Sequence, residues 1–344
     1  MRHAKLKGAL LAAATVAIAF AGFSTAAEAR VLVKLATNFP APEQTEYQAV
    51  EEFKNFVESR SGGEIEVRIF ASSLGGDREI FEQVQQGSLE MAFPADGGIA
   101  GFYPPVQVLS LPYAVPSSAV AWKVFDTDFM KALQQDMLDQ TGVRTLAVSE
   151  SGFRSMSNNV RPIKTPEDMK GLKMRTMESP VFMELMRALG STPTPLPATE
   201  IIISLKQGIV DGQENPIPAI AASGIGEVQK FVSADEHVLG VQFLVANDQW
   251  WQGLDDNTRQ ILTEGAILLA NYSQSVKLTR MKDAIEALEA MGTEVYINTL
   301  AEKEQFRDIA QPPVRAYIEE QVGAELVGDF LAAVEEATTE VYGD

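Results

Sequence analysis

Hydrophobic and polar positions follow two alternating periods along most of the chain. An apolar run at 31–36 predicts a buried strand, a helical spacing covers 43–60, and a strict alternation over 64–69 predicts a second strand. The same order continues, with further strands expected at 91–93, 143–148, 154–158, 173–177 and 209–212, and helices at 77–87, 117–140, 179–189, 199–206 and from 166. This alternation favours α/β lobes whose largely parallel sheets are covered by helices on both faces.

One amphipathic pattern is much longer than the others. It covers residues 255–291 without a proline, and a single helix of that length would reach roughly 55 Å, more than one small lobe. The chain of 344 residues also exceeds the roughly 250–300 residues at which a single core stops growing. We therefore expect two lobes braced by one helix, or by two nearly continuous helices, with the crevice between the lobes as the default place for a small ligand.

The first 29 residues have the composition of a secretory signal peptide. A basic stretch ends at Lys7, a twelve-residue apolar run covers 10–21, and Ala27-Glu28-Ala29 supplies small residues before a cleavage site. The run is short for a bilayer span, although a retained anchor or a core helix is the alternative interpretation. We expect the mature chain to begin near Arg30 and to be soluble, because no other apolar stretch approaches roughly 18–20 residues.

The composition of the chain excludes some classes of partner and indicates the cellular compartment. The formal net charge of −19 argues against binding to nucleic acid or to an anionic membrane. The chain contains no cysteine, which excludes disulfides, thiolate nucleophiles, cysteine-based metal sites and a lipoprotein anchor. Because an exported protein without an anchor is retained only by an outer barrier, we expect the periplasm of a Gram-negative bacterium, with true secretion as the alternative.

The search for catalytic motifs returns mostly absences. Of the two histidines, only His237 remains after the signal peptide, which excludes a His-Glu-x-x-His zinc site and a three-histidine site. Neither a Gly-x-Ser-x-Gly elbow nor a glycine-rich phosphate loop is present. We expect a structural role for His237, with ligand contact as the alternative, and no metal or cofactor. Paired carboxylates could still hydrolyse a glycoside, so an exported hydrolase stays open.

Two dense segments carry groups that suit an anion. The first extends from Gly152-Phe153-Arg154 to Gly171-x-Lys173-x-Arg175, and the second is Asp211-Gly212-Gln213-Glu214-Asn215-Pro216. A guanidinium is a planar fork that holds a carboxylate bidentately, which the point charge of lysine cannot match. From the residues alone, however, an exposed strand end is the simpler interpretation of Arg175.

Taken together, the two segments resemble the solute-binding proteins of tripartite ATP-independent periplasmic (TRAP) transporters, of the dicarboxylate-binding (DctP-like) type. The resemblance extends to 75–77, 111–113 and 227–230 and covers nearly the whole mature chain. It implies a two-lobed α/β periplasmic-binding-protein fold, with a ligand cleft between the lobes and a long bracing helix. It also implies a protein, expected to be a monomer, that captures a small organic acid and delivers it to a sodium-coupled membrane permease. A sensor module that presents its ligand to a receptor kinase would share this binding chemistry.

The resemblance assigns roles to three residues. Arg175 matches the arginine that pairs with the ligand carboxylate, Arg154 matches a second carboxylate contact, and Asn215 matches an amide that hydrogen-bonds the same region. Arg161 and Arg187 are expected at the surface. The implied division is a signal peptide at 1–29, lobe I at 30–151 plus 240–280, and lobe II at 152–239 plus 281–344.

Position along the strands suggests four further ligand contacts. Asn38 and Phe39 follow the first strand, where a ligand-facing loop is expected in an open α/β sheet. Asp77 and Asp96 follow later strands of the same lobe and could accept ligand hydroxyls, although helix capping or turn formation would also explain them.

Two departures from the family pattern bear on specificity. Family members commonly carry an aromatic residue two positions before Glu200 and a tyrosine two positions after it, whereas this chain has Ala198 and Ile202. The pocket wall is therefore expected to be wider or less polar there. Dicarboxylates, sugar acids and hydroxy acids all remain open as ligands.

Overall fold

The computed structural model describes residues 30–40 and 42–343. The predicted signal peptide lies outside these residues. The strands are β1 Val31–Thr37, β2 Ile65–Ala71, β3 Met91–Phe93, β4 Val143–Asn158, β5 Lys173–Thr176, β6 Thr192–Pro195, β7 Gly212–Pro216, β8 Phe231–Asn247 and β9 Glu294–Tyr296. The helices are α1 Thr45–Arg60, α2 Asp77–Gln85, α3 Asp96–Ile99, α4 Ser118–Phe125, α5 Asp128–Thr141, α6 Pro180–Ala188, α7 Ile201–Lys206, α8 Ile217–Ala222, α9 Asp248–Gln252, α10 Asp256–Ala290, α11 Leu300–Val322 and α12 Ala324–Tyr342.

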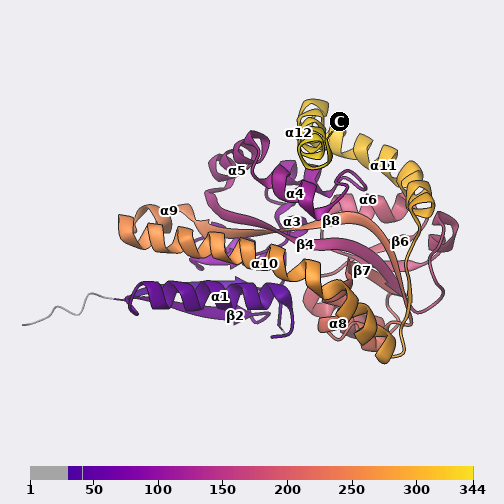
Figure 1. Cartoon of the computed structure of the whole chain (residues 1–344), viewed down its shortest axis with the longest axis horizontal. Coiled ribbons are helices and arrows are strands. Elements are labelled where there is room, and N and C mark those ends of the chain that lie inside the picture. The colour runs from indigo at the N-terminus through magenta and orange to yellow at the C-terminus, as the bar shows by residue number, and fades with distance from the viewer. Residues whose placement is uncertain (1–29, 41, 344) are drawn as a thin grey trace, which may run out of the picture.

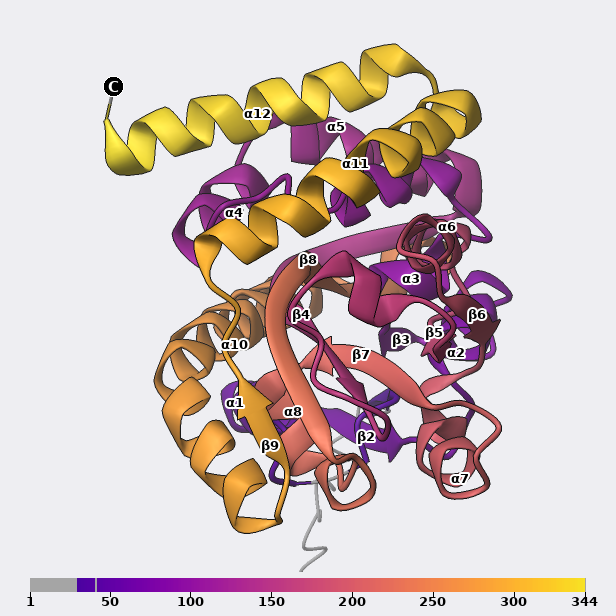
Figure 2. The same cartoon turned by 90° about the vertical axis from the view of Figure 1, so that its right-hand side faces the viewer.

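The strands of the described residues form one nine-stranded mixed sheet in the order β2-β1-β3-β8-β4-β7-β5-β6, with β9 beside β8. The outer pairs are parallel, as predicted: β1 pairs with β2 and β3, and β5 pairs with β6 and β7. The centre is antiparallel, so the prediction of largely parallel sheets was wrong there. The parallel pairs are joined by helical crossovers, whereas β4 and β8 are long strands that continue from one half of the molecule into the other (Figure 2).

The long pair β4–β8 explains why two predicted strands are one. The strands expected at 143–148 and 154–158 join through Gly152, which has a φ of 92° that glycine adopts without strain. The register shifts between Glu150 and Gly152, where Gly152 pairs with Gly240. A Cβ at Gly240 would lie 2.2 Å from Ser151 Oγ, so the two strands approach closely at this point.

The predicted bracing helix is present as α10, a single helix of 35 residues. Asp255 caps it by accepting a hydrogen bond from the Thr258 backbone N–H at 2.8 Å. One half of α10 packs against α1 and the other half against α8, so it joins the two halves of the molecule (Figure 1). The helix predicted at 117–140 instead divides into α4 and α5, because Thr127 caps a new helix start. Within the described residues, no helix is both long enough and apolar enough to cross a membrane.

The C-terminal helices complete the largest hydrophobic cluster. Phe306, Val314 and Ile318 of α11 are buried there against α6, and α12 packs on α4 and α5. Neither helix was predicted; in α11, Pro312 and Pro313 interrupt the helical pattern. Smaller clusters lie around α1 and the first half of α10, and around α7, α8 and the second half of α10. The largest cluster contains residues of both halves, such as Phe81 and Phe182.

Candidate functional site

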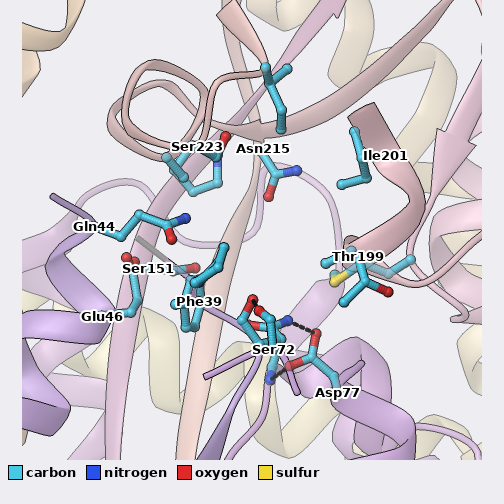
Figure 3. Close-up of a pocket in the computed structure, with 18 of the residues that line it drawn as sticks. Phe39, Gln44, Glu46, Ser72, Asp77, Ser151, Thr199, Ile201, Asn215 and Ser223 are labelled. Carbon is cyan, nitrogen blue, oxygen red and sulfur yellow. Dashed lines mark hydrogen bonds between the residues drawn. The ribbon is translucent and has the colours of Figure 1, made fainter. Parts of the chain in front are cut away.

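A cavity of about 350 Å³ lies where the loops after β1, β2 and β3 face β5, β7 and α8. In Figure 3, Ser72 and Asp77 lie on one side of it, and Asn215 and Ser223 lie on the other. Six of the seven residues predicted to bind ligand line this cavity: Asn38, Phe39, Asp77, Arg154, Arg175 and Asn215. The topology thus brings together side chains that are distant in the sequence.

Arg175 lies near the carboxyl end of β5 and is only 2% exposed. Its Nε donates to the backbone carbonyl of Leu196 at 2.8 Å, and among the described residues it has no carboxylate within ion-pair distance. Burial lowers the pKa of Arg175 to about 10 although the nearby Glu214 opposes this, so the group stays charged at neutral pH. A buried cation with unused donors is costly unless an anion joins it.

Arg154 is already engaged by a carboxylate of the protein. It forms a buried ion pair with Glu214, in which Nη2 donates to Oε1 at 2.9 Å and to the backbone carbonyl at 2.7 Å. Its guanidinium also lies 5.3 Å from the centroid of the Phe182 ring. Nη1 alone has no hydrogen-bond partner among the described residues, so Arg154 has far less capacity for a second anion than Arg175 has.

Behind Arg154, a chain of buried charges continues away from the cavity. His237 Nε2 is 3.3 Å from Glu214 Oε2, and its Nδ1 is 2.8 Å from Asp235 Oδ2. Burial alone would lower the pKa of His237, but Asp235 and Glu214 raise it to about 9. Burial would raise the pKa of Glu214, but Arg154 and His237 hold it at about 2. His237 does not line the cavity, which agrees with its predicted structural role.

Asp77 begins α2 and faces the cavity. Its Oδ2 accepts from Asn38 Nδ2 at 2.6 Å, and its Oδ1 accepts from the Ala95 backbone N–H at 3.0 Å. A Cβ on Gly98 would lie 2.3 Å from the Asp77 Cβ, so α3 can approach α2 only because Gly98 has no side chain. Burial raises the pKa of Asp77 to about 7, against the opposing effects of the Ala95 N–H and Arg175.

Asn215 and Asp96 differ in their access to the cavity. Asn215 lines it from β7, and its Nδ2 donates to Gln213 Oε1 at 2.5 Å. Asp96 does not line the cavity: it is 1% exposed and accepts a hydrogen bond from Ser110 Oγ at 2.7 Å. Burial raises the pKa of Asp96 to about 6, although Ser110 lowers it. The structure therefore places Asp96 behind the cavity wall.

Several lining residues were not predicted. Ser151, Ser223 and Gln242 each have a buried side-chain oxygen without a hydrogen-bond partner among the described residues. Ser151 and Gln242 belong to β4 and β8, whose pairing the local pattern did not reveal. No group of three histidine, aspartate or glutamate residues within 30–40 and 42–343 could hold a metal ion.

Comparison with known proteins agrees with this architecture. Residues 36–321 match the family model for bacterial extracellular solute-binding protein, family 7. A solute-binding protein of Verminephrobacter eiseniae is 36% identical over 282 residues, which cover 80% of this chain and 81% of that protein. The 2,3-diketo-L-gulonate-binding periplasmic protein of Escherichia coli is 30% identical over 298 residues, which cover 85% and 89%.

A solved structure gives the same result. The sugar acid binding protein of Advenella mimigardefordensis in complex with galactonate superimposes with a TM-score of 0.85 at 27% identity, covering 90% of this chain and 99% of that one. The predicted two-lobed α/β fold with a long bracing helix is thereby confirmed. The resemblance carried by the two dense segments is confirmed as well, and the chain belongs to bacterial extracellular solute-binding protein family 7, the DctP family of TRAP solute-binding proteins.

Proposed function

We propose that the protein captures a small organic acid by its carboxylate in the cavity between the lobes and delivers it to a TRAP membrane permease. The observation that carries the proposal is Arg175, a buried guanidinium that faces the cavity and has no carboxylate partner among the described residues. A ligand carboxylate would satisfy its remaining donors in a bidentate pair.

The ligands of related structures support an acid. Three solved structures of TRAP solute-binding proteins, at 27–28% identity to this chain, hold organic acids: (S)-2-acetolactate in the protein from Ralstonia eutropha, orotic acid in that from Desulfovibrio salexigens, and galactonate in that from Advenella mimigardefordensis. These molecules differ in size and shape but share a carboxylate. The common group is the one that Arg175 suits.

We further propose which residues act on the ligand. Arg175 would bind the carboxylate, with Asn215, Asn38, Phe39 and Asp77 completing the contact surface. Arg154 would act mainly by holding Glu214 and β7 in place, with one donor left for the ligand. Asp96 would support the wall of the cavity rather than contact the ligand.

Closure of two lobes on the ligand is the motion that this function needs. We propose the division at 30–151 plus 240–280 and 152–239 plus 281–344, because the β4–β8 register shift and the close approach of Gly240 fall at its first two boundaries, while the third lies within α10. In this division α12 belongs to the second lobe, although it packs on α4 and α5, which belong to the first. It would therefore have to slide or follow when the lobes move.

The same proposal covers the setting of the protein. Export through the segment at 1–29 would place it in the periplasm, the location named for the Escherichia coli relative. We propose that it acts as a monomer and binds rather than converts its ligand. In support of binding, the imidazole of His237 is held between two carboxylates and does not line the cavity.

The test is the Arg175→Lys variant, which keeps the positive charge but removes the planar fork. Loss of a charge-assisted hydrogen bond costs about 1.5–3 kcal/mol, so we expect carboxylate affinity to fall roughly 10- to 150-fold. Titration calorimetry would follow a thermal-shift screen of organic acids, since a ligand of the folded state raises the melting temperature.

Arg161→Lys is the matched control. Arg161 also donates to backbone carbonyls, at 2.8 Å to Asp168 and 2.7 Å to Lys170, but it does not line the cavity. We expect the Arg161→Lys variant to bind carboxylates with the affinity of the unmodified protein. If no organic acid shifts the melting temperature while neutral sugars do, the proposed function is wrong; equal affinity of Arg175→Lys and the unmodified protein would reject the role of Arg175.

A further inference from the structure

One residue of the cavity wall holds a backbone conformation that its side chain disfavours. Among the described residues other than glycine, three have a positive φ: Ser72 at 49°, Glu236 at 52° and Tyr113 at 55°. This left-handed region brings the Cβ close to the following carbonyl oxygen, so residues other than glycine enter it at a cost in free energy. Of the three, Ser72 alone lines the cavity. A strained residue beside a ligand cavity points to a role in binding.

Ser72 directly follows β2 and joins that strand to the end of β1. The last register pair of these two parallel strands is Thr37 with Ala71. One residue further on, the Ser72 backbone N–H donates to the Thr37 carbonyl at 2.7 Å, and Ser72 Oγ donates to the Asn38 carbonyl at 2.6 Å. The hydroxyl thus adds a hydrogen bond beyond the end of the strand pairing, at the residue where the chain leaves β1.

The hydrogen bond from Ser72 holds the backbone of a residue that lines the cavity. Asn38 is 7% exposed, and both it and Phe39 belong to the cavity wall. Ser72 holds Asn38 at its backbone carbonyl, and Asp77 holds it at its side chain, where Nδ2 donates to Oδ2 at 2.6 Å. Ser72, Phe39 and Asp77 lie on the same side of the cavity (Figure 3). The two hydrogen bonds therefore set the position of Asn38, and with it that of Phe39, in the wall.

Glycine would adopt the backbone conformation of Ser72 without strain. The same loop has a glycine at Gly75, where φ is 111° and a Cβ would lie 2.6 Å from the Glu79 Cβ. At Ser72, by contrast, a side chain is present and its hydroxyl is used. Because glycine cannot supply that hydroxyl, the strain at Ser72 accompanies a bond to the Asn38 carbonyl that a side chain is needed to make.

We propose that Ser72 is a positioning residue of the ligand site, whose hydroxyl and strained backbone hold Asn38 and Phe39 where they contact the bound acid. The inference rests on the proposed function, because it takes the cavity as the place where the acid binds. Side chains that are already in place spare the ligand the entropy of ordering them. Loss of the hydroxyl should therefore weaken binding even where it does not weaken the fold.

Two substitutions separate positioning from stability. Ser72→Ala removes the hydroxyl but keeps a Cβ in the left-handed region, whereas Ser72→Gly removes the hydroxyl and relieves the strain. We expect both to raise the Kd by about three- to tenfold, because a neutral hydrogen bond is lost. Ser72→Gly should nevertheless have the higher Tm of the two. A purely structural role predicts instead that the variant with the higher Tm binds more tightly.

Titration calorimetry gives the Kd, and thermal unfolding followed by circular dichroism gives the Tm. The probe is the tightest-binding acid of a thermal-shift screen that contains galactonate, orotate and (S)-2-acetolactate. Ser72→Thr tests rescue, because threonine keeps the hydroxyl while its branched Cβ increases the strain. We expect Ser72→Thr to bind within about twofold of the unmodified protein although its Tm is lower.

Ser73→Gly is the matched control, because Ser73 is the next residue of the same loop, is exposed and does not line the cavity. This substitution loosens the loop but keeps the hydrogen bond to Asn38, so we expect an unchanged Kd. The inference is overturned if Ser72→Ala and Ser72→Gly bind as tightly as the unmodified protein, or if Ser73→Gly loses as much affinity as they do. Binding of Ser72→Thr as weak as that of Ser72→Ala also overturns it.

The two proposals fail in different ways. If no acid of the screen binds, the proposed function fails, and the inference fails with it. If an acid binds and depends on Arg175 but has the same Kd for the Ser72 variants as for the unmodified protein, only the inference fails.

Discussion

Breaking the buried pair of Arg154 and Glu214 should cost the protein much more stability than breaking an exposed ion pair. The side chains are 4% and 0% exposed, and Glu214 also faces His237. Glu214→Gln keeps the size of the side chain but leaves Arg154 as a buried charge without a counterion. Removing one partner of a buried pair costs about 3–5 kcal/mol.

The pKa of Glu214 gives a similar magnitude. Burial would raise this pKa, yet Arg154 and His237 lower it from 4.5 to about 2. Each unit is worth about 1.4 kcal/mol, so the folded state gains about 3 kcal/mol at neutral pH from holding Glu214 ionised. This stabilisation is present above the unfolded pKa near 4.5 and is lost as the pH falls toward 2.

Urea unfolding followed by circular dichroism measures this loss. We expect Glu214→Gln to lower the free energy of unfolding at neutral pH by about 3 kcal/mol, equivalent to about 5 °C in Tm for a chain of this length, and to flatten the acid limb between about pH 4.5 and pH 2. Glu340→Gln is the control, because it breaks an exposed pair with Lys123 and should leave the midpoint unchanged. A Glu214→Gln midpoint equal to that of the unmodified protein would refute the reasoning.

Two further predictions use the same assays. The carboxylates of Asp235 and Glu214 outweigh burial and raise the pKa of His237 from 6.5 to about 9. The stability that the fold gains from charged His237 should therefore be complete below about pH 6.5 and lost as the pH rises through 9. His237→Asn should remove this fall in the urea midpoint between about pH 6 and pH 10. Gly98→Ala should weaken ligand binding and lower Tm, because the new Cβ would lie 2.3 Å from the Cβ of Asp77. Gly101→Ala is the control and should change neither, because its nearest neighbour would lie at 3.8 Å. Equal effects of the two substitutions would contradict the close approach of α3 and α2.

The hydrophobic pattern along the chain was sufficient to predict a helix or strand where that element buries one face against a single neighbour. The helix α10 keeps an uninterrupted helical pattern and was predicted to within one residue at each end. The strand β1 is largely apolar, and β2 begins with alternating apolar and polar residues; each pattern predicted its strand. Arg175 was accessible to sequence reasoning because its motif is compact, whereas its burial depends on β5 lying between β6 and β7.

The strand β8 shows why the rest could not be predicted. Its 17 residues are buried on both faces, so no two-residue period distinguishes inside from outside. In its middle, Asp235, Glu236 and His237 look like a surface turn, yet Asp235 and His237 are fully buried. Their burial is tolerated because Asp235 pairs with His237 and accepts a hydrogen bond from the Met156 backbone N–H at 3.1 Å, while the other ring nitrogen of His237 faces Glu214. Met156 and Glu214 are distant in the sequence, so these partners can be identified only from the tertiary structure.

An acidic chain can bind an anionic ligand because the charges on its surface are screened by salt, whereas the charges in the cavity act on the ligand at close range. The net charge of −19 is spread mainly over exposed side chains, and at physiological salt such charges are screened beyond about 8 Å. The cavity is governed instead by buried pairs, in which Glu214 occupies Arg154 and Lys277 occupies Glu46. Because Glu214 neutralises Arg154, Arg175 is the cationic side chain of the cavity wall that is left, among the described residues, to meet a ligand carboxylate, and its local field, not the net charge of the chain, is what such a ligand would meet.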